Sequence, residues 1–120
     1  MRDYRSESIW LVNFEPQIGT EIKKTRPALI ISASEFNRVR KKVTLLPITS
    51  KAIANPTLEP VVVTVKASIT NGLDKDSIII AIEPNTFDKK RCIKYLGQID
   101  LEILSEVKQK LNIYLDLLNS

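Results

Sequence analysis

The sequence predicts a small, mostly antiparallel β-barrel followed by one C-terminal helix. Short runs of β-branched and aliphatic residues alternate with turn residues over the first four-fifths of the chain. After Asp100 the apolar residues change to a spacing of three and four, which is typical of one helix face. A chain of 120 residues suffices for one hydrophobic core, so we expect a single domain over residues 1–120 with mainly β structure.

Five or six strands are expected. They correspond to residues 9–14, 28–31, 43–48, 61–65 and 77–82, with 93–99 as the sixth. Pro47 removes a backbone donor from the third run, which predicts an edge position or a bulge there. The polar connection that begins at Ser34 is expected to hold one helical turn.

The C-terminal helix is predicted from its apolar spacing and its start signal. Asp100 is the expected N-cap, and Glu106 and Lys110 form a favourable i,i+4 pair. The apolar stripe comprises Leu104, Val107, Leu111, Tyr114, Leu115 and Leu118. Further apolar residues at 103, 113 and 117 make this face wider than one small sheet would cover. We therefore expect part of it to contact a partner in a homodimer.

Composition excludes several kinds of chemistry. The chain has no His and only one Cys, so a His general base, a Cys-based zinc site and an intrachain disulfide are excluded. We expect no metal and no cofactor, and we expect Trp10 and Cys92 to be core residues. The charged N-terminus and the lack of an apolar run of about 20 residues predict a cytoplasmic protein without membrane contact. A net charge of +4 favours polyanionic partners.

Most of the positive charge lies in one part of the sequence. Residues 21–42 contain seven cations against Glu21 and Glu35. Such clustering suits binding of a phosphate backbone, although solvated loop charges would give the same pattern. Arg26 precedes Pro27 at the start of a buried run, and Thr49 ends the next run.

These residues also carry a resemblance to a known family. The segment 9–32, IWLVNFEPQIGTEIKKTRPALIIS, closely resembles the opening of the MazF/PemK family of toxin endoribonucleases. The resemblance continues in the family's order and spacing through LPITS at 46–50, GLDKDS at 72–77, DKKR at 88–91 and LGQI at 96–99. Before the first strand the chain has Glu7-Ser8, where members usually carry a glycine and an acidic residue.

The resemblance implies a fold, an activity and partners. The fold would be an SH3-like barrel, present as a symmetric homodimer. The activity would be metal-independent, sequence-specific cleavage of single-stranded mRNA that leaves 2′,3′-cyclic phosphate and 5′-OH ends. A cognate antitoxin would neutralise the toxin and bind DNA together with it, and we expect an acidic tail of this antitoxin to cover the basic groove.

The resemblance also assigns residues. Arg26 and Thr49 match the family's catalytic arginine and threonine, and Glu21 matches the loop glutamate of some members. A guanidinium can bind two equatorial oxygens of a phosphorane, a hydroxyl can donate to the same oxygens, and a carboxylate can accept the 2′-OH proton. The expected RNA-binding residues are Gly19, Thr20, Lys23, Lys24, Thr25, Ser50 and Lys51.

Two other classes of protein share this kind of fold. A gyrase poison of the CcdB type needs no phosphate-cleaving residues, and it ends in Trp-Gly-Ile, whereas this chain ends in Leu-Leu-Asn-Ser. A non-catalytic SH3-like binding module would present a groove of several aromatic side chains, whereas the aromatic residues here are scattered along the sequence. Both comparisons favour the nuclease.

Overall fold

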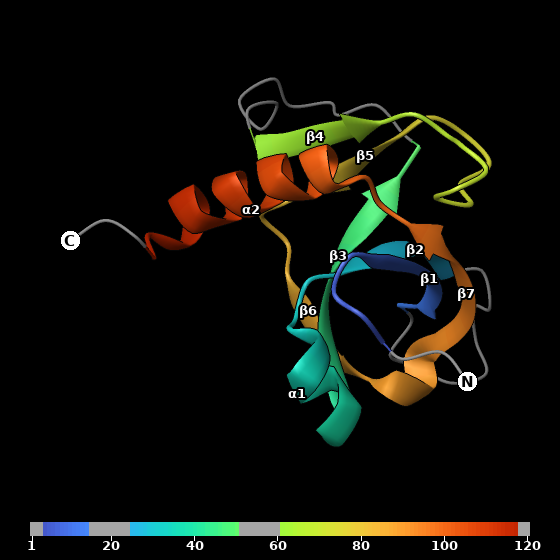
Figure 1. The fold of residues 1–120 in the computed structure, drawn as a ribbon, viewed down its shortest axis with the longest axis vertical. Helices are drawn as coiled ribbons and strands as arrows, with labels where there is room; N and C mark the ends of the chain where they lie inside the picture. The colour runs from blue at the N-terminus through green and yellow to red at the C-terminus, as the bar shows by residue number, and fades with distance from the viewer. Residues whose placement is uncertain (1–3, 15–24, 51–60, 118–120) are drawn as a thin grey trace.

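A computed structural model describes residues 4–14, 25–50 and 61–117. Their elements are β1 (Ser8–Asn13), β2 (Thr25–Ile30), α1 (Ser34–Val39), β3 (Lys42–Thr49), β4 (Val62–Val65), β5 (Ser77–Ile80), β6 (Asn85–Asp88), the 3-10 helix η2 (Lys89–Arg91), β7 (Cys92–Gln98) and α2 (Leu101–Leu115) (Figure 1). The predicted class, mainly β with a C-terminal helix, is confirmed. The expected helical turn at Ser34 is a six-residue helix.

The strands form one antiparallel sheet in the order β4-β5-β3-β2-β1-β7, and β6 pairs with β3 outside this path. The described residues therefore hold seven strands, where five or six were expected. The additional strand, β6, is short and polar and follows Pro84, so neither its length nor its composition marks it as β structure.

Strand β3 changes its partner along its length. Residues 42–45 pair with β6, and residues 48 and 49 pair with β5. Pro47 lies between these two ladders and opposite Ala28 of β2. Strand β3 is therefore not an edge strand, but at Pro47 it pairs only with β2 among the described residues, so the predicted edge position holds locally. The missing N–H of Pro47 interrupts neither the β5 ladder nor the β6 ladder.

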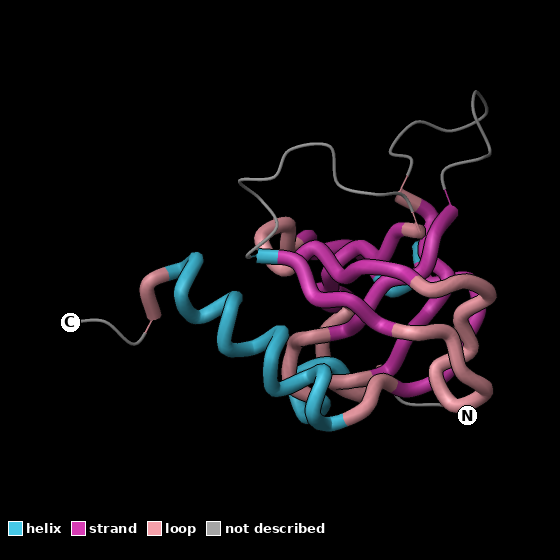
Figure 2. The backbone as a smooth tube through the Cα atoms, turned by 90° about the horizontal axis from the view of Figure 1, so that it is seen from above, coloured by secondary structure: helices cyan, strands magenta, loops and turns pink. Residues whose placement is uncertain are grey.

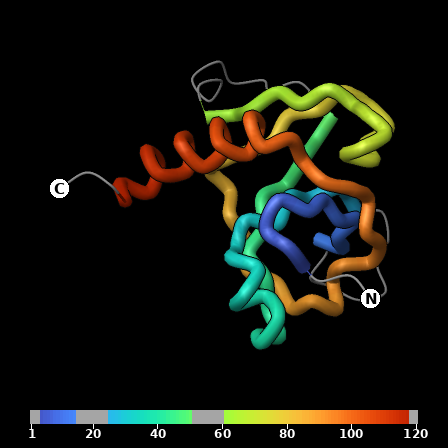
Figure 3. The backbone as a smooth tube through the Cα atoms, viewed as in Figure 1, coloured from blue at the N-terminus to red at the C-terminus, as the bar shows by residue number. Residues whose placement is uncertain are grey.

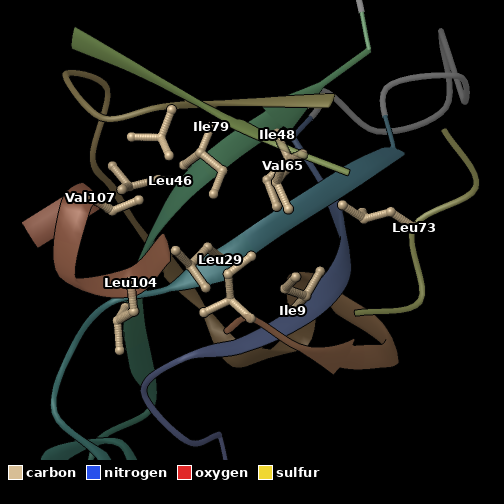
Figure 4. Packing of buried hydrophobic residues seen from close by; sticks show 11 residues of the cluster. Ile9, Leu29, Leu46, Ile48, Val65, Leu73, Ile79, Leu104 and Val107 are labelled. Atoms are coloured by element: carbon tan, nitrogen blue, oxygen red, sulfur yellow. The ribbon is translucent and has the colours of Figure 1, made fainter. Parts of the chain in front are cut away.

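The inner strands are buried on both faces. The first cluster fills the space between the sheet and α2, and Figure 4 shows Leu46 and Leu29 of the sheet near Val107 and Leu104 of the helix. The second cluster, on the opposite face, contains Trp10, Val12, Ala28, Ile30, Val43 and Leu45. Each fully buried Leu or Ile contributes roughly 1.5–3 kcal/mol over an exposed one. The two clusters therefore determine which face each strand residue occupies.

The expectation of a closed barrel needs one correction, because no described residue of β4 pairs with β7. Residues 68–73 lie along β7 instead, and the Gln98 amide donates to the Thr70 carbonyl at 3.0 Å. A Cβ on Gly97 would lie 2.2 Å from that same oxygen. A Cβ on Gly72, which has a φ of +71°, would lie 2.0 Å from the Leu96 carbonyl oxygen. Two glycines thus permit a close backbone contact between this turn and β7.

The buried side chains of helix α2, Leu104 and Val107, lie in its first half. Asp100 is the N-cap residue as predicted, although its side chain makes no capping hydrogen bond. Lys110 is 3.4 Å from Glu106, as expected, and its Nζ also donates to the Val62 carbonyl at 2.9 Å. Beyond this contact the helix extends away from the body (Figures 2 and 3). The exposed apolar residues of this part are Ile113, Tyr114, Leu115 and Leu117.

Glu7 has a left-handed backbone, with a φ of 83°. Its amide donates to the Ile30 carbonyl at 2.9 Å, and its carbonyl accepts from the Ile99 amide at 3.0 Å. These two bonds connect the chain before β1 with the ends of β2 and β7. A residue with a Cβ pays roughly 1–2 kcal/mol for this conformation, whereas glycine adopts it freely.

We predict that Glu7→Gly stabilises the protein. The relief of the left-handed strain outweighs the larger chain entropy of glycine by about 0.5–1 kcal/mol. Urea denaturation followed by circular dichroism measures the difference. Glu7→Ala is the matched control, because it removes the carboxylate but keeps the Cβ, and it should give no gain. Equal stabilisation by both variants would contradict the backbone explanation.

Candidate functional site

A cleft of about 650 Å³ opens where β2 begins and β3 ends. Lys94, Leu11 and Pro27 lie side by side on β7, β1 and β2, since Leu11 is the register partner of both other residues. All three line the cleft. The other lining residues are Thr25, Arg26, Ile48, Thr49, Ser50, Gly72, Leu73, Asp74 and Leu96.

Arg26 and Thr49 come from two adjacent strands and both line this cleft. The pairing of β2 with β3 ends at Ala28 and Pro47, and Arg26 and Thr49 each lie two residues beyond that pair. Residues two apart on a strand project to the same face, so Arg26 shares a face with Ala28 and Thr49 shares one with Pro47. Arg26 is exposed and Thr49 is half-buried. A ligand in the cleft can therefore reach a guanidinium and a hydroxyl from adjacent strands.

The Arg26 guanidinium lies over an aromatic ring. Its Cζ is 5.7 Å from the centroid of Phe14, and Phe14 packs edge-to-face on Phe87 at 5.4 Å. Arg91 lies over Phe87 at 5.1 Å and donates from Nη1 to the Asn13 carbonyl at 3.2 Å. We call Arg26, Phe14, Phe87 and Arg91 the cation–aromatic row. Stacking on Phe14 restricts the rotamers of Arg26 without neutralising its charge.

The structure places some of the expected RNA-binding residues at the cleft. Thr25 and Ser50 both line it and are exposed. Six of the expected site residues lie outside the described residues, so their roles stay predictions: Gly19, Thr20, Glu21, Lys23, Lys24 and Lys51.

Two charged residues at the cleft were missed by the sequence reasoning. Lys94 comes from the exposed side of β7, and Asp74 comes from the loop before β5. Asp74 is the one carboxylate among the described residues that line the cleft, although only Glu21 was expected near the site. The GLDKDS segment was recognised as part of the resemblance, but nothing local to it indicates a position beside Arg26.

Trp10 is a core residue, as predicted. It is 8% exposed and stacks on Tyr4 with ring centroids 4.6 Å apart. Its indole Nε1 donates to the Ser8 hydroxyl at 3.0 Å, so its polar atom is satisfied inside the protein. Because Tyr4 covers one face of the indole ring, an RNA base cannot stack on Trp10 from that side.

Cys92 is half-buried against the second cluster. Burial first, and the Asp88 carboxylate second, raise the pKa of its thiol against the opposing effect of Lys89, from 9.0 to about 11 in total. The thiol therefore stays protonated near neutral pH and is a poor nucleophile.

Within the described part of the chain, no helix is long and apolar enough to cross a membrane. In the same residues, no three acidic or cysteine side chains gather where they could hold a metal ion.

Comparison with known proteins assigns this fold and cleft to a class of toxins. The chain matches, over residues 5–115, the family described as PemK-like, MazF-like toxin of type II toxin-antitoxin systems, and it belongs to that family. Its relatives include Endoribonuclease PemK of Escherichia coli, which is 31% identical over 94% of this chain and 83% of the relative. Endoribonuclease MazF9 of Mycobacterium tuberculosis is 29% identical over 94% of this chain and 97% of the relative.

Solved structures give the same result for the fold. MazF in a MazE–MazF crystal structure from Deinococcus radiodurans superposes with a TM-score of 0.77 and 28% identity, covering 94% of this chain and 96% of that one. A crystal structure of MazF from the same organism gives a TM-score of 0.72 and 29% identity, covering 93% and 94% of the two chains. The SH3-like fold class is consistent with these neighbours.

We predict that Cys92 reacts slowly with iodoacetamide. Only roughly 0.1% of a thiol with a pKa near 11 is ionised at pH 8, against roughly 10% when the pKa is 9.0. Alkylation of the folded protein at pH 8 should be about 100-fold slower than that of the urea-unfolded chain, and its rate should rise with pH up to about 11. Mass spectrometry of timed samples measures both rates. Equal rates in the folded and unfolded states would disprove the shift.

Proposed function

We propose that this chain, as a single domain over residues 1–120, is a metal-independent endoribonuclease toxin that cleaves single-stranded mRNA at specific sequences. Membership of the toxin family and the names of the relatives support the endoribonuclease activity. The observation that carries the proposal is that Arg26, at the start of β2, and Thr49, at the end of β3, line the same cleft. The family match does not favour the gyrase-poison alternative.

The proposed reaction is attack of a ribose 2′-OH on the adjacent phosphodiester. The 2′-oxygen forms a bond to phosphorus, its proton passes to a base, and the bond from phosphorus to the 5′-oxygen breaks. The 5′-oxygen takes up a proton, leaving 2′,3′-cyclic phosphate and 5′-OH ends. The intermediate phosphorane carries extra negative charge on its equatorial oxygens. In this proposal Arg26 binds two of them and Thr49 donates its hydroxyl to the same group.

The base that accepts the 2′-OH proton is proposed to be Glu21. A carboxylate suits this step, whereas a guanidinium stays protonated. Asp74 is a second carboxylate at the cleft, and it gives the site an alternative acceptor. Comparison of Glu21→Gln with Asp74→Asn would separate the two.

The proposed partners are a cognate antitoxin and a second copy of the chain. Among the similar structures are complexes of a MazF with its MazE and of a mycobacterial endoribonuclease with its cognate antitoxin, which supports an antitoxin partner. An acidic antitoxin tail would place carboxylates where RNA places phosphates. We further propose that toxin and antitoxin act in the cytoplasm and bind DNA together.

The direct test of the function is incubation of purified protein with a long RNA in EDTA, followed by mapping of the ends. Discrete cuts that bear 2′,3′-cyclic phosphates are expected. Intact RNA would overturn the nuclease proposal, and inhibition of gyrase by the same preparation would replace it.

We predict that Arg26→Ala lowers the single-turnover cleavage rate by about 100-fold or more, while RNA affinity falls much less. Arg26→Lys should not restore the rate, because an ammonium lacks the planar fork. Thr49→Ala should show a smaller loss. Lys66→Ala, which removes an exposed cation outside the cleft lining, is the control and should cut normally. An Arg26→Ala protein with a normal melting curve and nearly full activity would refute the catalytic assignment.

We predict a homodimer that uses the second half of α2. Ile113 and Leu117 are 65% and 60% exposed, which is an unfavourable state for apolar side chains of a monomer. Sedimentation at micromolar concentration should show a dimer for the natural sequence and a monomer for Ile113→Asp. Lys108→Asp, an exposed position on another side of the same helix, should stay dimeric. A monomeric natural protein would contradict this prediction.

A further inference from the structure

Pairing of β3 with β6 brings together two basic segments that are far apart in the sequence. Lys42 is opposite Asp88, and the Lys89 amide donates to the Lys41 carbonyl at 2.8 Å. We call the resulting cluster the basic end; it consists of Arg40, Lys41, Lys42, Lys89, Lys90 and Arg91. In Figure 1, β3 runs from this end to the tip that carries Thr49.

The charges of the basic end are largely uncompensated. Arg40, Lys41, Lys42 and Lys90 are exposed, and none of these four is in ion-pair contact with a carboxylate among the described residues. Asp88 uses its side chain to accept the Lys90 amide. Exposed cations of one sign attract a polyanion and release its counterions when they bind it.

The cation–aromatic row connects the basic end with the cleft. Arg91 belongs to the basic end, and Arg26 belongs to the cleft, with Phe87 and Phe14 in contact between them. The seven residue steps from Lys42 to Thr49 span about 23 Å at the usual strand rise. Cations and half-buried aromatic rings therefore lie together along one side of the molecule, with the two rings between Arg26 and Arg91, from the proposed catalytic pair to the other end of β3.

The presence of aromatic rings beside these cations distinguishes between two kinds of polyanion. An acidic peptide would need the cations alone, whereas unpaired bases stack on aromatic rings while their phosphates contact Lys and Arg. Lys89 lies over Tyr4 at 5.0 Å, which adds another ring beside a cation of the basic end.

We propose that the cation–aromatic row and the basic end bind the single-stranded RNA that extends beyond the cleaved phosphodiester on one side. This inference rests on the proposed function, because it assumes that the cleaved phosphate lies at Arg26. Phosphates contact the basic end, and bases stack on Phe14 and Phe87 or on the guanidinium groups of Arg26 and Arg91 that lie over these rings. The surface thus provides affinity for long substrates that the cleft alone does not provide.

The test uses a fluorescein-labelled 2′-O-methyl oligouridylate of about 20 nucleotides. This length exceeds the number of nucleotides that a small single-strand-binding domain covers. Its 2′-oxygen cannot attack, so binding is read without cleavage. Fluorescence anisotropy at several KCl concentrations compares natural protein with the double variant Lys42→Gln, Lys90→Gln. Glutamine avoids the like-charge contact with Asp88 that glutamate would create. The matched control, Lys66→Gln with Lys108→Gln, removes two exposed lysines outside the proposed surface.

We expect the double variant to bind about 10-fold more weakly near 0.1 M salt and to reduce the slope of log K against log salt by about 1.4, which is 0.7 for each lost contact. The control should change affinity by less than about 2-fold. Phe87→Leu should weaken binding by about 5-fold or more with an unchanged slope, because it removes stacking and no charge.

Equal losses in the two double variants would overturn the inference, because they would show an effect of net charge alone. Unchanged RNA binding combined with weaker binding of a polyglutamate peptide would also overturn it and would assign the surface to an acidic partner. If the protein fails to cut RNA in EDTA but shows the expected binding losses, the RNA surface stands and the proposed cleavage falls. If it cuts RNA and the variants bind normally, only this inference falls.

Discussion

Burial of β3 on both faces is the constraint on which the rest of the structure depends. Val43 and Leu45 belong to the cluster that contains Trp10, whereas Leu46 and Ile48 belong to the cluster under α2. A shift of one residue against β2 would exchange these two sets between the faces of the sheet. The register is thereby fixed by packing, and the positions of Arg26 and Thr49 follow from it. The site is a product of the hydrophobic pattern as much as of its own residues.

Features that depend on local pattern could be predicted from the sequence. The long apolar runs of β1 and β3 and the helical spacing after Asp100 each contain enough residues to show their period. Strand β6 could not be found this way, because a four-residue segment with three polar residues becomes a strand only by pairing with β3. Whether the sheet closes into a barrel could not be predicted from the sequence either, since it depends on how closely residues 68–73 approach β7.

The residues of the candidate site also fall into those that a local motif predicts and those that only the fold brings together. Arg26 and Thr49 could be chosen from their motifs and the family resemblance, and their proximity needs only one strand pairing. Asp74, Lys94 and Phe14 reach the same region from three other parts of the chain. No single segment contains that information, because it lies in the pairing of β7 with β1 and in the course of the loop before β5. The basic run was read as one cluster, whereas the structure separates Arg26 from Lys42 by the length of β3.

The contact between β7 and residues 68–73 also links Gly97, which lies outside the cleft, with residues of the cleft wall. Gly97 has no room for a side chain beside Thr70, and Gly72 and Leu96 both form part of the cleft wall. Any side chain at Gly97 must push the turn away from β7 and carry Gly72, Leu73 and Asp74 with it. Selection of cells that survive expression of the toxin would therefore recover replacements of Gly97, although this residue does not itself line the cleft.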